Sequence, residues 1–287
     1  MTEKILITGA TGTIGNALVK ALLEKNATFV AAVRNPEAAR EKLGPDVDMV
    51  TFAFKDATTF EAATKGITKV FLLGPPIVTN LEELLTPFIN FLKSKSIIRV
   101  VYVGALGLEH VKELPFHTNL IAKLKDDDFN YTILKPSFFS QNFKNYEWEN
   151  ITQKGVTFFT AGSGKAAFID VEDVAAVAAT VLTEEGHGKK AYELTGPVAL
   201  SYFDAAAALS EVVGKPIFYP NPSPAEYTNA LKAAGAPDFI APYMISVYSL
   251  IANHYVDYVT SDVLKVTGKN PSTLTDVLER DFTRAKV

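Results

Sequence analysis

The 287-residue sequence predicts an α/β fold: a doubly wound parallel sheet with a smaller, mostly helical C-terminal domain. Short β-branched runs alternate with helical patterns throughout the first half, which is typical of right-handed βαβ units. Runs such as residues 100–103 are apolar on both faces, as a sheet covered by helices on both sides requires. After Lys135 the alternation ends, and from Ser201 onward the pattern is mostly helical.

Each predicted element follows from its periodicity and its flanking residues. Strands are predicted at residues 4–8, 28–33, 48–52, 69–73, 99–103, 130–135 and 191–194. Helices are predicted at residues 14–25, 36–43, 59–65, 80–93, 117–126 and 171–183.

Composition and charge exclude several classes of function. The net charge is −4 and the basic residues form no cluster, which argues against nucleic acid as a partner. There is no cysteine, and the four histidines are not spaced to share a metal, so no metal site is expected. The N-terminal residues show no leader pattern, and no apolar run is long enough to span a bilayer, so we expect a cytoplasmic protein without membrane contact. The oligomeric state is not predicted.

A glycine-rich turn follows the first predicted strand and opens the first predicted helix. Its first glycine allows a tight turn, its second allows the backbone to approach a pyrophosphate, and its third allows close packing of helix on strand. The helix N-terminus adds unpaired N–H groups and a partial positive charge. This context favours a Rossmann-type, dinucleotide-binding fold over a turn that only makes a tight corner. The turn comprises Gly9, Ala10, Thr11, Gly12, Thr13, Ile14 and Gly15.

The second predicted strand indicates which cofactor is bound. An NAD site requires Asp or Glu at the end of this strand to bind the ribose 2′-hydroxyl. No acidic residue occurs from Asn26 to Pro36, and Arg34 stands at the strand end. Its guanidinium suits a 2′-phosphate, although a solvated surface arginine would look the same. The sequence therefore predicts NADPH.

The pattern of predicted strands and helices indicates two interleaved domains. An NAD(P)-binding Rossmann domain is predicted over residues 1–150, with residues 170–195 returning to it. A smaller substrate or lid domain is predicted over residues 151–287.

Three segments carry a resemblance to a known family: ITGATGTIG at residues 7–15, VRN at 33–35 and YTILKPSFFSQNF at 131–143. With them the chain resembles the NmrA-like branch of the atypical short-chain dehydrogenases/reductases. Residues 161–175 and 179–194 look most similar to bacterial triphenylmethane reductase and to NADPH-dependent quinone oxidoreductases. The resemblance covers nearly the whole chain and is least specific over the last seventy residues.

The resemblance implies further cofactor contacts in loops at the carboxyl ends of the strands. Asp56 matches a residue that faces the adenine in many relatives, but it is equally explained as a helix N-cap. The other implied contacts are Leu73, Gly74 and Pro75 after the fourth strand, Gly104 after the fifth, and Pro136 at the end of the sixth.

The superfamily's catalytic Tyr and Lys would fall at Glu113 and His117, so that proton relay is absent. Tyr131 and Lys135 fit the YxxxK spacing in letters only, because that motif works on a helix and four steps along a strand span about 13 Å. His117 is our candidate catalytic residue, as an imidazole that donates a hydrogen bond and titrates near neutral pH. The alternative is a histidine that packs against the preceding Pro115-Phe116.

An aromatic segment follows the sixth predicted strand, where the architecture places it beside the nicotinamide. An aromatic floor suits a flat acceptor, whereas the alternative is a helix that buries its aromatic residues between the two domains. The candidate substrate-binding residues are Phe138, Phe139, Phe143 and Trp148.

These features predict an NADPH-dependent oxidoreductase that transfers hydride to a flat conjugated acceptor, such as a quinone or a triarylmethane dye. A quinone accepts hydride readily and its oxyanion can be protonated by solvent, so a dedicated acid is less necessary. The alternative function is an NmrA-type NAD(P)-binding redox sensor without turnover. A sugar-nucleotide epimerase is disfavoured, since the Tyr/Lys pair is missing.

Overall fold

The structure, a computed structural model, describes residues 3–95, 97 and 99–283. The chain forms two compact units and passes between them several times. Unit 1 comprises Met1–Ala105, Phe116–Lys135 and Val171–Glu193. Unit 2 comprises Leu106–Pro115, Pro136–Asp170 and Leu194–Val287.

Seven strands form one sheet in the order β3-β2-β1-β4-β5-β6-β8. The pairs β1/β2, β1/β4, β2/β3, β4/β5 and β5/β6 are parallel. The strand order reverses between β1 and β4, which is the point where open α/β sheets bind ligands beyond the carboxyl ends of their strands. The strands are β1 (Ile5–Ile7), β2 (Phe29–Val33), β3 (Met49–Thr51), β4 (Lys69–Leu72), β5 (Arg99–Val103), β6 (Tyr131–Pro136) and β8 (Lys190–Leu194).

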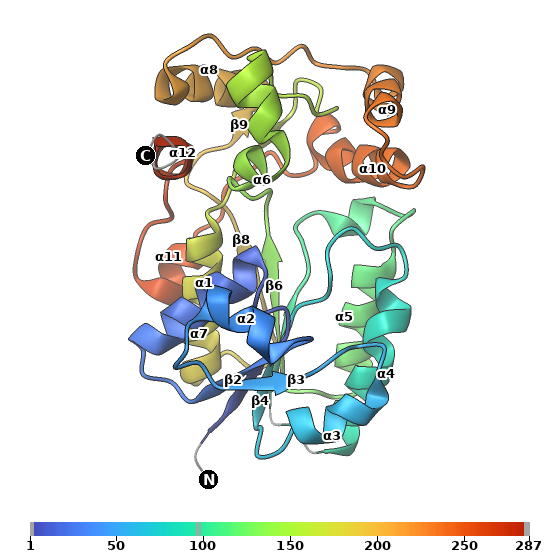
Figure 1. Ribbon diagram of the computed structural model, residues 1–287, viewed down its shortest axis with the longest axis vertical. Coiled ribbons are helices and arrows are strands. Elements are labelled where there is room, and N and C mark those ends of the chain that lie inside the picture. Colours follow the sequence, from blue (N-terminus) through green and yellow to red (C-terminus); the bar gives the residue numbers. More distant parts are fainter. Residues whose placement is uncertain (1–2, 96, 98, 284–287) are drawn as a thin grey trace. The chain divides into compact units, whose positions relative to one another are not determined.

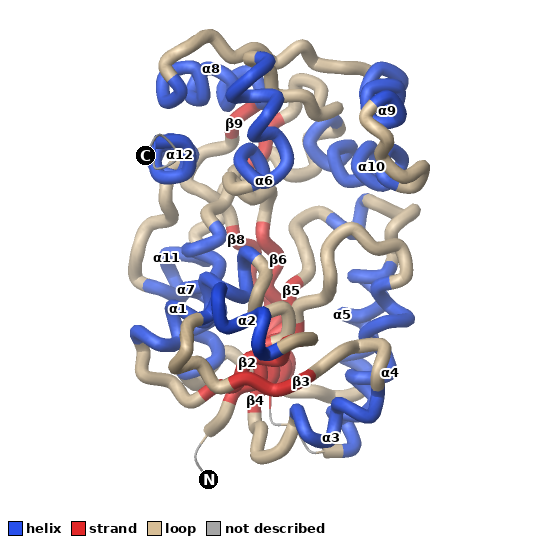
Figure 2. Tube along the Cα trace, in the orientation of Figure 1, coloured by secondary structure: helices blue, strands red, loops and turns tan. Residues whose placement is uncertain are grey.

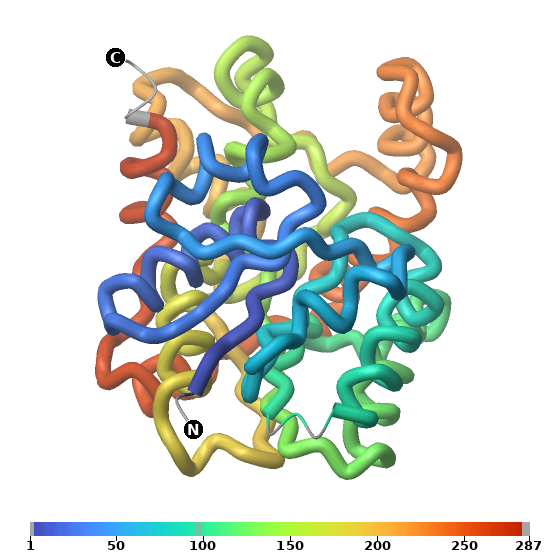
Figure 3. The backbone as a smooth tube through the Cα atoms, turned by 60° about the horizontal axis from the view of Figure 1, so that its bottom comes forward, coloured from blue at the N-terminus to red at the C-terminus, as the bar shows by residue number. Residues whose placement is uncertain are grey.

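Helices cover both faces of this sheet (Figures 1 and 2). On one face α1 packs against α7 and α2, and on the other α4 packs against α5. Figure 3 shows α4 and α5 side by side in teal and green. Because both faces are covered, every residue of β1, β2, β4 and β5 is buried. The helices are α1 (Thr13–Glu24), α2 (Pro36–Leu43), α3 (Phe60–Ala63), α4 (Leu81–Ser94), α5 (Phe116–Asp126) and α7 (Val171–Thr183).

Local sequence sets where the helices begin. The Asn35 side chain accepts a hydrogen bond from the Ala38 amide, and Pro36 occupies the first position of α2. Ser201 and Asp204 form a reciprocal capping box at the start of α8 (Tyr202–Val213), as Ser223 and Glu226 do at the start of α9 (Pro224–Ala233). The start of α1 is different, because its cap residue has no side chain.

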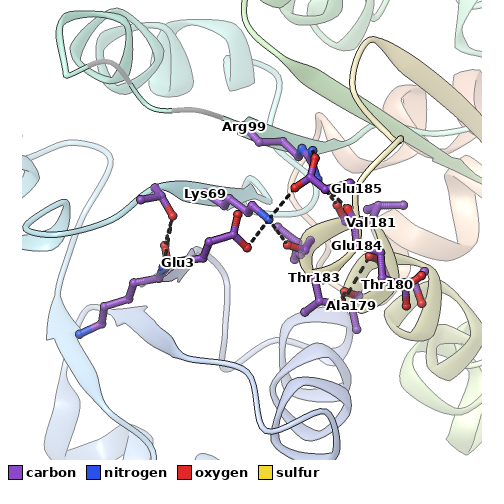
Figure 4. Close-up of polar contacts among 12 residues, drawn as sticks. Glu3, Lys69, Arg99, Ala179, Thr180, Val181, Thr183, Glu184 and Glu185 are labelled. Atoms are coloured by element: carbon purple, nitrogen blue, oxygen red, sulfur yellow. Dashed lines mark hydrogen bonds and ion pairs between the residues drawn. The ribbon is translucent and has the colours of Figure 1, made fainter. Parts of the chain in front are cut away.

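Two buried cations lie at the amino ends of β4 and β5 and hold the end of α7 (Figure 4). Lys69 Nζ donates to the Leu182 carbonyl at 2.9 Å and pairs with Glu3 at 2.6 Å. Arg99 Nη1 donates to the Val181 and Glu184 carbonyls, both at 2.9 Å. These contacts satisfy C-terminal carbonyls of α7 and place positive charge at the negative end of its dipole.

Unit 2 is mostly helical and contains a two-stranded antiparallel sheet, β7 with β9. A π-helical turn, Asn150–Lys154, continues directly from α6. The helices of unit 2 are η2 (Leu108–His110), α6 (Asn142–Glu149), α8 (Tyr202–Val213), α9 (Pro224–Ala233), α10 (Ile240–Ala252), α11 (Asp262–Thr267) and α12 (Leu274–Thr283). The strands of unit 2 are β7 (Lys165–Ala166) and β9 (Leu200–Ser201).

The core of unit 2 is built from aromatic rings and a buried ion pair. Tyr202 packs against Phe143, Phe159 and Tyr219 with ring centroids 5.4–5.5 Å apart. The fully buried carboxylate of Asp170 accepts two hydrogen bonds from Arg280, both at 2.9 Å. This bidentate contact joins α12 to the residue that precedes α7.

The structure confirms the predicted fold class and most predicted elements of the first half. The strand at 99–103 and the helices at 36–43 and 171–183 have the predicted limits, and the other predicted strands and helices differ by a few residues at their ends. Residue 98 precedes β5 and lies outside the described residues.

Candidate functional site

The glycine-rich turn lies between β1 and α1, with each glycine at a position that a side chain would disturb. Gly9 has a φ of 67°, the left-handed region, and its carbonyl accepts a hydrogen bond from the Gly12 amide at 3.0 Å. A Cβ on Gly15 would lie 2.2 Å from the Gly9 carbonyl oxygen. A Cβ on Gly12 would lie 3.3 Å from the same oxygen. The turn is therefore as tight as its spacing predicts.

Helix α1 begins at Thr13 without a side-chain cap. Its N-cap is Gly12, which makes no side-chain hydrogen bond, and its first turn carries no acidic residue. The N–H groups of the first turn and the positive end of the helix dipole are thus left for a ligand. An anionic pyrophosphate fits this arrangement in charge, in donors and in the space left by the missing side chains.

Thr8 joins the glycine turn to the loop after β4. Its buried hydroxyl accepts a hydrogen bond from the Leu73 amide at 2.8 Å and lies 3.0 Å from the Leu73 carbonyl. A Cβ on Gly9 would lie 3.1 Å from the Leu73 side chain, and one on Gly74 would lie 2.4 Å from Leu81. The structure therefore brings Leu73 against the glycine turn, whereas Gly74 packs against Leu81 of α4, with Pro75 next in the chain. Sequence reasoning missed Thr8, although its place directly before Gly9 was a usable signal.

The ends of β2 and β3 carry the two residues expected to contact the adenosine half of the cofactor. Arg34 follows the last residue of β2, and its side chain is exposed. Asp56 follows β3 and accepts hydrogen bonds from the Thr58 amide at 3.0 Å and hydroxyl at 2.6 Å. Asp56 is thus the N-cap of the short helix η1 (Ala57–Thr59), which was the alternative interpretation of this residue.

Gly104 and Pro136 lie at the carboxyl ends of β5 and β6. The Gly104 amide donates to the Leu134 carbonyl at 2.9 Å, which continues the β5/β6 pairing by one residue. Pro136 is the last residue of β6, and its carbonyl accepts from the Leu106 amide at 2.9 Å. Tyr131 and Lys135 also lie on β6, which confirms that they cannot act as the helical YxxxK pair.

His117 lies in the first turn of α5 and is hydrogen-bonded to a tyrosine of β5. Its Nδ1 is 2.6 Å from the hydroxyl oxygen of Tyr102, whose side chain is fully buried. The two ring centroids are 5.8 Å apart. His117 also contacts the ring of Phe116, at 5.1 Å between centroids, as the packing alternative expected.

Burial sets the protonation of this pair. It lowers the pKa of His117 from 6.5 to about 4, because the charged imidazolium loses hydration there. Burial also raises the pKa of the Tyr102 phenol well above its ordinary value, because the charged phenolate would lose hydration there. The expectation that His117 titrates near neutral pH is therefore wrong. Its imidazole is neutral at pH 7 and can act as a hydrogen-bond donor but not as a cationic acid.

The four aromatic candidates divide into two groups within unit 2. Phe143 is 1% exposed and packs against Phe168 and Tyr202, and Trp148 stacks on Phe282 with centroids 5.1 Å apart. Neighbouring rings cover Phe143, so it is a core residue, although the sequence predicted that it contacts the substrate. Phe138, Phe139 and Trp148 are partly exposed.

The described residues contain no group of three or more His, Asp or Glu side chains that could hold a metal ion. Among the same residues, no helix combines the length and the apolar character needed to cross a membrane.

Comparison with known proteins places this geometry in a family. Residues 9–185 match the NAD(P)H-binding family model. The chain is 32% identical over 277 residues to an NAD(P)H azoreductase of Xenophilus azovorans, covering 95% of this chain and 96% of that protein.

Two solved structures share the fold over almost the full length. An NADPH-dependent quinone oxidoreductase of Escherichia coli, crystallised with NADPH, matches with a TM-score of 0.86 and 28% identity, covering 97% of this chain and 99% of that one. A triphenylmethane reductase of Citrobacter sp. matches with a TM-score of 0.87 and 25% identity, covering 98% and 99%. The chain therefore belongs to the NAD(P)H-binding family, and it is an NAD(P)H-dependent oxidoreductase with a Rossmann-type fold.

Proposed function

We propose that the protein transfers hydride from NADPH to a flat conjugated acceptor, such as a quinone or a triarylmethane dye. The observation that carries this proposal is the glycine turn with the uncapped N-terminus of α1, which fits a pyrophosphate. The quinone and dye reductases among the structural relatives support the acceptor class. Bound NADPH would supply the hydride, and the residues of this chain bind and orient the two reactants.

The cofactor contacts follow from the arrangement of the strand ends. The turn from Gly9 to Gly15 would hold the pyrophosphate, and Arg34 would pair with the 2′-phosphate at the end of β2. Asp56 would lie near the adenine while it caps η1. The remaining contacts would come from the loops beyond β4, β5 and β6, at Leu73, Gly74, Pro75, Gly104 and Pro136.

His117 is the proposed catalytic residue. Its Nδ1 is engaged with Tyr102, so Nε2 is the ring nitrogen left to contact a ribose hydroxyl or the carbonyl oxygen of an acceptor. A neutral imidazole can stabilise a developing oxyanion by donating a hydrogen bond from this atom. Phe138, Phe139 and Trp148 are the proposed contacts to the acceptor ring, since all three keep exposed surface.

Steady-state oxidation of NADPH against a panel of quinones, triarylmethane dyes, azo compounds and aldehydes tests this function. We expect turnover with quinones and dyes, little with simple aldehydes, and a lower Kd for NADPH than for NADH. If NADPH binds tightly but no acceptor is reduced, the chain acts as an NAD(P)-binding sensor and the proposal is wrong.

A further inference from the structure

We infer that Tyr102 is a positioning residue that fixes His117 as a neutral donor through Nε2, and that this pair serves carbonyl-type acceptors but not cationic dyes. The inference rests on the proposed function for its kinetic part only. Its structural part, the protonation of the His117 ring, can be tested in the protein without any acceptor.

The direction of the Tyr102–His117 hydrogen bond follows from the buried hydroxyl. The oxygen lies 2.6 Å from Nδ1, and the phenol keeps its proton because burial disfavours the phenolate. Among the described residues, His117 is the only hydrogen-bond partner of that hydroxyl. If Nδ1 carried a proton, the phenol O–H would be buried without an acceptor, which costs about 1–3 kcal/mol. The phenol therefore donates to Nδ1, and the ring proton lies on Nε2.

The position of the pair relates it to the reacting end of the cofactor. Tyr102 is the fourth residue of β5 and His117 the second residue of α5, so both lie near the carboxyl edge of the sheet in unit 1. Ligands of doubly wound sheets bind beyond this edge. Since Tyr102 is fully buried, it acts only through His117.

A hydrogen-bond donor matters only where negative charge develops on the acceptor. When hydride adds to a quinone, the electron pair moves to a carbonyl oxygen, which becomes an oxyanion and then takes a proton from water. The Nε2–H of His117 would stabilise that oxyanion without giving up its proton. When hydride adds to the central carbon of a triarylmethane cation, the product is neutral and no oxyanion forms. The two acceptors therefore differ in their need for the pair.

A second Tyr–His pair in unit 1 provides a matched control. The Tyr192 hydroxyl lies 2.7 Å from Nδ1 of His187, and burial also lowers the pKa of His187. His187 lies three residues before Lys190, the first residue of β8, and the intervening Lys189 amide donates to the carbonyl of Tyr131, the first residue of β6. This pair thus lies at the amino edge of the sheet, opposite the strand ends that bind ligands.

The kinetic experiment compares Tyr102→Phe, His117→Ala, the double variant and the control Tyr192→Phe with a quinone and with a cationic triarylmethane dye. For the quinone we expect His117→Ala to lower kcat about 100-fold, the scale of losing an oxyanion donor. Tyr102→Phe should lower it by about 2- to 10-fold, because the freed imidazole loses its fixed orientation and can carry its proton on either nitrogen. The double variant should match His117→Ala, and Tyr192→Phe should behave as the parent.

The dye serves as an internal control for folding and cofactor binding. We expect each variant that changes Tyr102 or His117 to lose much less activity with the dye than with the quinone, because the dye reaction develops no oxyanion for the pair to stabilise. Equal losses with quinone and dye would overturn the inference, as would a double variant whose loss equals the product of the single losses.

The tautomer is read directly from a long-range proton–nitrogen correlation spectrum of nitrogen-labelled protein. We expect the His117 ring to show an unprotonated Nδ1 and a protonated Nε2 in the parent, and a mixture of tautomers in Tyr102→Phe. A protonated Nδ1 in the parent would refute the positioning role of Tyr102. If the tautomer is as expected but no acceptor is turned over, the proposed function fails and the positioning role stands.

Discussion

Arg34 follows the last residue of β2, and its exposed guanidinium is the charge expected to select NADPH. We predict that Arg34→Ala weakens NADPH binding by about 1.5–3 kcal/mol, the range for a hydrogen bond to a charged group, and leaves NADH binding nearly unchanged. Isothermal titration with both cofactors measures this difference. The matched control is Arg40→Ala, because Arg40 is exposed on the adjoining helix α2 and its guanidinium contacts the Pro45 carbonyl. Equal losses for both cofactors, or an equal effect of Arg40→Ala, would contradict the assignment.

The lowered pKa of His117 predicts a loss of stability in mild acid. Its pKa is about 4 in the folded protein and 6.5 in the unfolded chain, so between these values only the unfolded chain takes up the proton. The free energy of unfolding should therefore fall as the pH falls from about 6.5 to 4, by at most about 1.4 kcal/mol per unit. Urea unfolding across this interval should give a shallower dependence for His117→Ala than for the parent. An identical slope in both proteins would show that this ring is not protected from protonation.

At the level of single residues, the sequence was most informative where one local pattern defines the chemistry. The glycine spacing and the missing acid before Arg34 are visible in a dozen residues each. The Tyr102–His117 contact is not visible in the sequence. Tyr102 resembles the other core residues of an apolar strand, and its partner lies 15 positions away on a helix. The low pKa of His117 results from burial of its ring in the folded protein. The sequence alone supplies only the ordinary pKa of a histidine, so it predicted titration near neutral pH.

The secondary-structure elements differ in how well their limits could be predicted. Helices such as α2 and α7 carry their own start signals and apolar stripes, and the sequence placed both correctly. Strands β7 and β9 have two residues each and exist only because they pair with each other across 33 intervening positions. The π-helical turn after α6 has no periodicity of its own. Elements defined by distant partners leave no local pattern to recognise.

The end of α7 depends on the two buried cations of β4 and β5. Replacing Arg99 by Met would leave the Val181 and Glu184 carbonyls without their donor, and at about 1–3 kcal/mol for each unsatisfied carbonyl we predict a loss of about 2–6 kcal/mol in the free energy of unfolding. Glu185 also pairs with Arg99, at 2.9 Å, but its side chain is 78% exposed. Glu185→Gln should therefore cost less than about 1 kcal/mol. Urea unfolding of both variants measures the difference, and similar losses would show that the carbonyl contacts do not stabilise α7.

For the molecule as a whole, the two units divide the proposed work between cofactor and acceptor. Every proposed cofactor contact except Pro136 lies in unit 1, and all aromatic candidates lie in unit 2. The segment Leu106–Pro115 belongs to unit 2 although it connects β5 and α5 of unit 1. The amino-acid composition does not change over this ten-residue segment, so the sequence does not show that it belongs to unit 2. Long-range contacts decide to which unit a segment belongs.

NADP⁺ should stabilise unit 1 more than unit 2. A ligand present at about 100 times its Kd adds about 2.7 kcal/mol to the free energy of opening the region that binds it. Amides of β1, β2 and β4 that exchange only by unfolding of unit 1 should then exchange about 100-fold more slowly. Amides of α8 and α12, which lie in unit 2, should gain much less, because opening unit 2 leaves the phosphate contacts of unit 1 in place.

A flat quinone added with NADP⁺ should extend the protection to residues 138–143. Hydrogen exchange read by mass spectrometry or NMR measures all three effects, with NADP⁺-free protein and the Arg34→Ala variant as references. Equal protection of both units by NADP⁺ alone would mean that they unfold as one cooperative body, and would contradict the prediction that the cofactor stabilises unit 1 selectively.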